Sequence, residues 1–242
     1  MEVSTTTTFS RKEDFILEVH RRLSEVYGAG IKYFHDLDPL SEAVSALLSH
    51  RTKNKDSGQA FKNLVLTFGT WEAVRDAPTT AVEAAISPCT WPEQKAPRIQ
   101  QVLRLITEKQ GSLSLDFLTE MDIMAAREWL EELPGVGPKT SAAILSFSTM
   151  RAKALPVDSH HFRVAVRLGI IEERIGEGKA NRVLENLLPA DFSSQEMYDH
   201  HQVVMRHGQK ICTHFRPACK ECVLLDICPA GPVFLKEGKA AK

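Results

Sequence analysis

The sequence predicts an all-α fold, and three observations lead to this prediction. Apolar residues recur at intervals of three and four along most of the chain, which is the period of a helix. No segment shows the alternation of a convincing strand ladder, and no Gly/Ser-rich linker separates autonomous domains. At 242 residues, with 43% hydrophobic and 25% charged residues, the chain can form one large globular unit or two small ones.

The helical segments follow one another from the N-terminus to the cysteine-rich end. Ser10 and Glu13 have capping-box spacing, and the helix that they open is expected to stop at Gly28. Ser193 and Glu196 form a second such pair before residues 196–205. The other predicted helical segments are one opening at Ser41 and those at 61–68, 99–106, 123–133, 142–147, 161–168 and 180–188.

Net charge and targeting signals limit how the protein can bind a partner and where in the cell it is expected. Thirty basic residues against thirty-one acidic ones give a net charge of −1. This excludes a protein held on nucleic acid by overall charge, but not one with a local basic face. The N-terminus lacks the features of a secretory signal, and no apolar run approaches the roughly 20 residues that span a bilayer. We therefore expect a cytoplasmic protein without a signal peptide or membrane contact.

The cysteines give the strongest local signal. Four of the five, Cys212, Cys219, Cys222 and Cys228, follow the spacing C-x6-C-x2-C-x5-C. Four thiolates suit an iron-sulfur cluster or zinc, but zinc sites more often use two short pairs on separated arms. The spacing favours a 4Fe-4S cluster over zinc and over unliganded thiols. Cys89 lies far away in the sequence and is expected to be a free thiol.

The run LPGVGPKT between two helical segments is typical of a helix-hairpin-helix motif. Its glycines permit a tight turn whose backbone amides form a nest for a phosphate oxygen, and its second proline suits the first turn of the next helix. Such a motif binds the nucleic-acid backbone without reading sequence, whereas the alternative is a plain capped turn between helices. The residues expected to contact DNA here are Gly135, Val136, Gly137 and Thr140.

Lys139 and Asp158, nineteen positions apart, form the candidate catalytic pair. Lys139 either contacts a phosphate or acts as a nucleophile, because the positive end of a helix dipole favours a neutral amine that can form a Schiff base. Asp158 either caps the helix that follows it or stabilises positive charge on a sugar as a base departs. One helix and a return loop supply enough chain to bring the two together.

In this order, LPGVGPKT, VDSHHFRV and the four-cysteine loop resemble the endonuclease III family of helix-hairpin-helix DNA glycosylases, over roughly residues 10–230. The resemblance implies a two-lobed fold with DNA across the cleft. A six-helix domain would span 33–152, and an iron-sulfur cluster domain would combine 1–32 with 153–242.

The family's chemistry maps onto matching positions of this chain. By the resemblance, Lys139 displaces the damaged base by attacking C1′, and the resulting Schiff base permits β-elimination, which nicks the strand. Asp158 stands at the place of the family's catalytic aspartate. The implied partner is duplex DNA that carries an oxidised or ring-saturated pyrimidine or an abasic site, bound by a monomer after the target is flipped out.

Some segments match the family by place but not by residue. Arg51 stands where the family commonly has a gap-filling Gln, and Trp91 lies in the segment of the apolar wedge, although a buried core role is its alternative. Lys139 and Asp158 are one residue farther apart than usual. Arg216 and Lys220 in the cysteine loop either contact phosphates or belong to a solvated face.

Two alternative functions stay open at this point. One is mainly an abasic-site lyase with weak or unusual glycosylase activity, which the Arg51 and Trp91 departures favour. The other is a non-catalytic protein that binds damaged DNA, against which the presence of both Lys139 and Asp158 argues.

Overall fold

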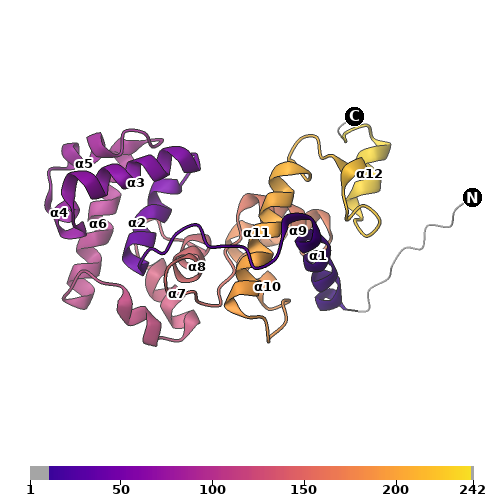
Figure 1. The fold of residues 1–242 in the computed structure, drawn as a ribbon, viewed down its shortest axis with the longest axis horizontal. Coiled ribbons are helices and arrows are strands. Elements are labelled where there is room, and N and C mark those ends of the chain that lie inside the picture. Colours follow the sequence, from indigo (N-terminus) through magenta and orange to yellow (C-terminus); the bar gives the residue numbers. More distant parts are fainter. Residues whose placement is uncertain (1–10, 241–242) are drawn as a thin grey trace, which may run out of the picture. The chain divides into compact units, whose positions relative to one another are not determined.

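The structure is a computed structural model that describes residues 11–240 (Figure 1). Within these residues every regular element is a helix, and no strand occurs, which confirms the all-α prediction. The chain divides into two units, Tyr33–Ala152 and Met1–Lys32 with Lys153–Lys242. Among residues 11–240, none of the helices has the length and hydrophobicity of a membrane span.

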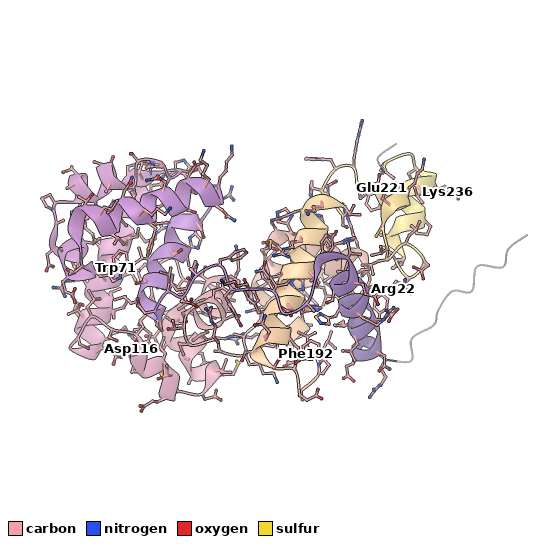
Figure 2. All side chains as sticks on the ribbon, in the orientation of Figure 1. Arg22, Trp71, Asp116, Phe192, Glu221 and Lys236 are labelled. Atoms are coloured by element: carbon pink, nitrogen blue, oxygen red, sulfur yellow. The ribbon has the colours of Figure 1, made fainter. Side chains whose placement is uncertain are left out.

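The unit Tyr33–Ala152 is built around α2, which packs against α3, α6 and α8, while α6 also packs against α4 and α5. Trp71 at the start of α4, labelled in Figure 2, joins this packing, because its Nε1 donates a hydrogen bond to Ser41 Oγ at 3.0 Å. The elements are α2 (Pro39–Ser49), α3 (Asn54–Phe68), α4 (Trp71–Asp76), α5 (Thr79–Ala85), α6 (Pro92–Gln110), the 3-10 turn η1 (Asp116–Glu120), α7 (Ile123–Glu131) and α8 (Pro138–Phe147).

The second unit is organised around α11, which packs against α1 and α9. Its core combines apolar side chains of these three helices with α10 and the cysteine loop. Arg22 on α1, labelled in Figure 2, ties this core to the loop, because its guanidinium donates hydrogen bonds to Val223 O and Asp226 Oδ1. The elements are α1 (Lys12–Tyr27), α9 (Ser159–Arg167), η2 (Glu173–Ile175), α10 (Glu177–Glu185), α11 (Ser194–Lys210), η3 (Cys219–Glu221) and α12 (Ala230–Lys236).

Helix ends follow from local chemistry, with one correction to the sequence prediction. The capping box of Ser193 and Glu196 is present, since each side chain accepts a hydrogen bond from the other residue's backbone amide. Ser10 lies outside the described residues. The helix expected to open at Ser41 begins at Pro39 instead. The Asp38 side chain caps it by accepting hydrogen bonds from the amides of Leu40 and Ser41, and proline suits the first helical residue.

Candidate active site and cysteine loop

The helix-hairpin-helix is formed by α7, the turn 132–137 and α8. Gly135 has φ +85°, and a Cβ there would lie 2.8 Å from Arg98 Cδ, so both backbone conformation and space favour glycine. Gly137 has an ordinary φ of −106° and open space around it. Val136 is buried and its amide donates to Leu133 O at 3.0 Å, which leaves the amides of Gly135 and Gly137 as the candidate phosphate donors of this turn.

Lys139 lines a hollow of about 440 Å³ within the unit Tyr33–Ala152. It is the second residue of α8, after Pro138, and it is exposed. Arg51 and Trp91 line the same hollow, so the structure brings these three sequence-predicted residues together. The remaining lining residues are Leu47, Ser49, His50, Gln94, Lys95, Arg98 and Ile99, and they include no carboxylate.

Arg51 and Trp91 share an unusual backbone conformation. Their φ angles are +51° and +54°, in the left-handed region that costs a non-glycine residue roughly 1–2 kcal/mol. Arg51 is exposed, and Trp91 is 47% exposed as the N-cap of α6, so Trp91 is not a core residue. Strained, exposed residues of this kind concentrate at functional sites.

His50 also lines this hollow, although the sequence carries no signal that marks it as a site residue. Its Nε2 lies 3.1 Å from Thr140 Oγ1, directly beside Lys139 in the chain. Burial lowers the pKa of His50 to about 4, with smaller contributions from the positive charges of Lys139, Lys95 and Arg98. The imidazole is therefore neutral at pH 7. Thr140 is itself buried, so its hydroxyl faces His50 inside the protein.

Asp158 belongs to the second unit, where it caps α9. Its Oδ1 accepts a hydrogen bond from the amide of His161 at 2.7 Å, which is the expected N-cap geometry. The carboxylate is only partly buried. The structural role that the sequence allowed for Asp158 is thus present, and it leaves one carboxylate oxygen outside this cap bond.

The four cysteines of the loop line one hollow in the second unit. Arg167 Nη1 donates to Cys212 Sγ at 3.3 Å and to Thr213 O at 2.7 Å, and its Nη2 donates to His214 O at 2.7 Å. The amide of Leu224 lies 3.4 Å from Cys222 Sγ. Among residues 11–240, no group of three or more Cys, His, Asp or Glu has the arrangement that holds a single metal ion.

The hollow fits a cofactor that binds thiolates. Burial raises the pKa of Cys222 to about 12 and also raises those of Cys219 and Cys228, so a bound metal would be what holds these three sulfurs as thiolates. Metal-bound thiolates accept hydrogen bonds from nearby donors. The Arg167 guanidinium is such a donor at Cys212 Sγ, and the Leu224 amide is one at Cys222 Sγ. Cys89 is a buried free thiol in the other unit, as expected.

Arg216 and Lys220 are exposed on this loop, between the first and third cysteines. The turn beneath them is closed by Thr213 Oγ1, which donates to Arg216 O at 2.7 Å. Phe215 beside them is 85% exposed, and its ring lies edge-on to His214. An exposed aromatic next to the cationic Arg216 is a second feature that the sequence alone does not predict.

Comparison with known proteins agrees with this fold and these motifs. Residues 44–190 match the family model for "HhH-GPD superfamily base excision DNA repair protein". The chain is 31% identical to Endonuclease III of Thermotoga maritima over 193 residues, which is 80% of this chain and 84% of that protein. It is 28% identical to Endonuclease III of Sulfolobus acidocaldarius over 187 residues, 76% of this chain and 79% of that protein.

A solved structure titled as a non-covalent Endonuclease III-DNA complex shares the fold, with a TM-score of 0.77 at 21% identity, over 93% of this chain and 98% of that one. Fold, hairpin and family match together define a base excision DNA repair protein of the HhH-GPD superfamily. Within that superfamily the chain belongs to the endonuclease III family, and it is a DNA glycosylase.

Proposed function

We propose that this glycosylase removes oxidised or ring-saturated pyrimidines from duplex DNA and also cleaves the strand at the abasic site. The observation that carries the proposal is the position of Lys139, exposed at the start of α8 in a hollow shared with Arg51 and Trp91. A catalytic amine, a gap-filling side chain and an apolar wedge are the three parts that a flipped nucleotide requires.

The proposed chemistry uses Lys139 as the nucleophile. Its neutral Nζ bonds to C1′ as the bond between C1′ and the base breaks, and the base leaves with the electron pair and takes up a proton. Opening of the sugar gives an iminium ion between Nζ and C1′. Loss of a proton from C2′ then expels the 3′ phosphate, which nicks the strand. Asp158 stabilises the positive charge that develops on the sugar ring.

The cysteine loop is proposed to hold a 4Fe-4S cluster through Cys212, Cys219, Cys222 and Cys228. The donor set of four thiols around one hollow, with the Arg167 guanidinium against Cys212 Sγ, supports this assignment. When bound, the cluster supplies iron-thiolate bonds that crosslink the loop. The loop itself then presents the exposed Arg216 and Lys220 to DNA phosphates.

Borohydride trapping tests the lyase proposal, because borohydride reduces the iminium ion to a stable amine. The wild-type protein should become covalently linked to duplex DNA with an abasic site or an oxidised pyrimidine, and Lys139→Ala should not. Lys109→Ala is the matched control, since Lys109 is paired with Glu132 and does not line the hollow. Full trapping by Lys139→Ala would overturn the assignment.

Arg51 and Trp91 favour one narrower alternative, an abasic-site lyase with weak or unusual glycosylase activity, because both positions govern how a damaged base is recognised. Separate measurement of base release and strand nicking on duplexes with single defined lesions distinguishes the two. Nicking of abasic DNA without release of any oxidised pyrimidine would establish the lyase alternative. A protein that binds these duplexes but neither releases a base nor nicks would be the non-catalytic binder.

A further inference from the structure

Lys95 is a buried lysine whose ammonium group donates three hydrogen bonds to one short segment of the chain. It is only 6% exposed. Its Nζ donates to Leu48 O at 2.6 Å, to His50 O at 2.8 Å and to Thr52 Oγ1 at 2.7 Å. A lysine ammonium has three protons, so these three acceptors satisfy it completely. All three lie in the segment 48–52, which carries Arg51.

The same segment is tied to the loop that carries Trp91. Thr52 Oγ1 accepts a second hydrogen bond, from the amide of Thr90 at 3.1 Å. Lys95 in turn lies one helical turn after Trp91, and its amide donates to Trp91 O at 3.1 Å. One ammonium group and one hydroxyl therefore join the residues next to Arg51 with the residues on both sides of Trp91.

Burying the Lys95 charge and holding Arg51 and Trp91 at positive φ both cost free energy, which argues that these contacts do more than fill space. Burial lowers the pKa of Lys95, so folding retains the charge there against a desolvation penalty. Arg51 and Trp91 are both held in the left-handed region. Residues in such conformations persist where surrounding contacts over-determine them, and the hydrogen bonds of Lys95 and Thr52 supply those contacts.

A further bond connects the segment to the helix of the proposed nucleophile. His50 Nε2 lies 3.1 Å from Thr140 Oγ1 on α8, next to Lys139. The segment 48–52 thus contacts α6 through Lys95 and α8 through His50. Because Arg51 lies between His50 and Thr52, loss of these hydrogen bonds would free Arg51 to shift relative to both Trp91 and Lys139.

We propose that Lys95 and Thr52 form a positioning clamp that holds Arg51 and Trp91 as a fixed pair, so that the two side chains enter paired DNA together. The clamp acts on the step in which a duplex is opened, and it has no role on a strand that is already single. This inference rests on the proposed function, because it assigns the pair to the opening of DNA around a flipped nucleotide. Lys95 and Thr52 are positioning residues, because they act through the segment 48–52 and the loop of Trp91.

Thr52 offers a matched pair of variants that tests the clamp with little change in shape. Thr52→Ser keeps the hydroxyl that links Lys95 and Thr90, whereas Thr52→Val has the same shape and removes it. The readout is binding of the holoprotein to a duplex and to a single strand, each carrying a tetrahydrofuran abasic analogue that no lyase can cleave. Borohydride trapping on the corresponding natural abasic DNAs is measured beside it.

We expect Thr52→Val to lose about tenfold in duplex affinity and in duplex trapping rate, below the roughly 100-fold loss of rate that a misplacement of about 1 Å can cause. Its single-strand values should stay at the wild-type level, and Thr52→Ser should match wild type on both. Lys95→Met should show the same selective loss, with a circular dichroism spectrum and thermal transition recorded to verify folding.

Equal losses on duplex and single strand would overturn the clamp and leave a general structural role. Unchanged duplex affinity in Thr52→Val would overturn it as well. Failure of the proposed lyase function gives a different result, because the wild-type protein itself would then trap on neither the duplex nor the single strand. The binding comparison with the uncleavable analogue would still decide whether the clamp exists.

Discussion

Asp158 combines a structural bond with a proposed chemical role, and substitution separates the two. The carboxylate caps α9 through the bond from the His161 amide at 2.7 Å. Replacing a helix N-cap by alanine costs about 1 kcal/mol, which lowers the Tm of a chain of this size by roughly 2–4 °C. Asparagine caps about as well as aspartate and forfeits only the charge-dipole attraction, roughly 0.3–1 kcal/mol.

Asp158→Asn should therefore remain close to wild type in thermal unfolding, whereas Asp158→Ala should show the larger fall in Tm. Both should lose the carboxylate's stabilisation of the positively charged sugar, a loss on the order of 100-fold in rate. Single-turnover release of an oxidised pyrimidine from duplex DNA measures the chemical effect, and affinity for an uncleavable abasic analogue measures binding.

The two roles predict opposite patterns for Asp158→Asn. Slow base release with retained DNA affinity and stability supports the chemical role. Wild-type rates in Asp158→Asn, combined with a defect confined to Asp158→Ala, would show that only the helix cap matters and would refute the reasoning.

Four further outcomes are expected. Gly135→Ala should destabilise the protein by about 1–2 kcal/mol and weaken DNA binding, because a φ of +85° is unfavourable for a residue with a Cβ. Gly137→Ala should be tolerated, because its backbone is ordinary and the space around it is open. Denaturant unfolding measures the stability of both variants, and binding titrations measure their DNA affinity. Arg167→Met should speed loss of the visible absorbance expected of the cluster and weaken DNA affinity, since Arg167 holds Cys212 and the loop carbonyls; an unaltered half-life would count against the scaffold role. Burial lowers the pKa of His200 to about 3, so between pH ~6.5 and pH 3 the unfolded chain binds a proton at this residue that the folded chain does not bind. The free energy of unfolding should therefore be highest above pH ~6.5 and fall toward pH 3. His200→Gln should reduce the slope of this fall by up to about 1.4 kcal/mol per pH unit, which pH-dependent unfolding measures. Replacing Arg216 and Lys220 together by Gln should reduce the slope of log Kd against log salt by about 2, and an unchanged slope would place both side chains off the DNA.

Much of the fold follows from sequence because long amphipathic helices carry many repeats of one pattern. Residues 99–106 of α6 and the capping box of Ser193 are examples. The short helices α4 and α5, of six and seven residues, and α12, of seven, escaped prediction because two turns are too few to establish a period. The start of α2 was misplaced because Asp38, three residues before Ser41, is the residue that caps it.

Site residues were predictable where they belong to a motif of neighbouring residues in the sequence. Lys139 follows a recognisable turn, and the cysteines have a defined spacing. Lys95 and His50 gave no such signal. The partners of Lys95 lie 43 to 47 positions earlier, and two of them are backbone carbonyls, which any residue supplies. The pairing of His50 with Thr140, 90 positions apart, likewise arises only from the packing of α2 near α8.

The central claim is that the amine of Lys139 becomes covalently bonded to C1′ of the damaged nucleotide. Mass spectrometry of peptides from the borohydride-trapped complex tests it most directly, because the reduced sugar remains attached to the residue that attacked. We predict the added mass on Lys139, in the peptide that follows Gly137. The added mass on any other amine, whether Lys95 or the N-terminus, would contradict it.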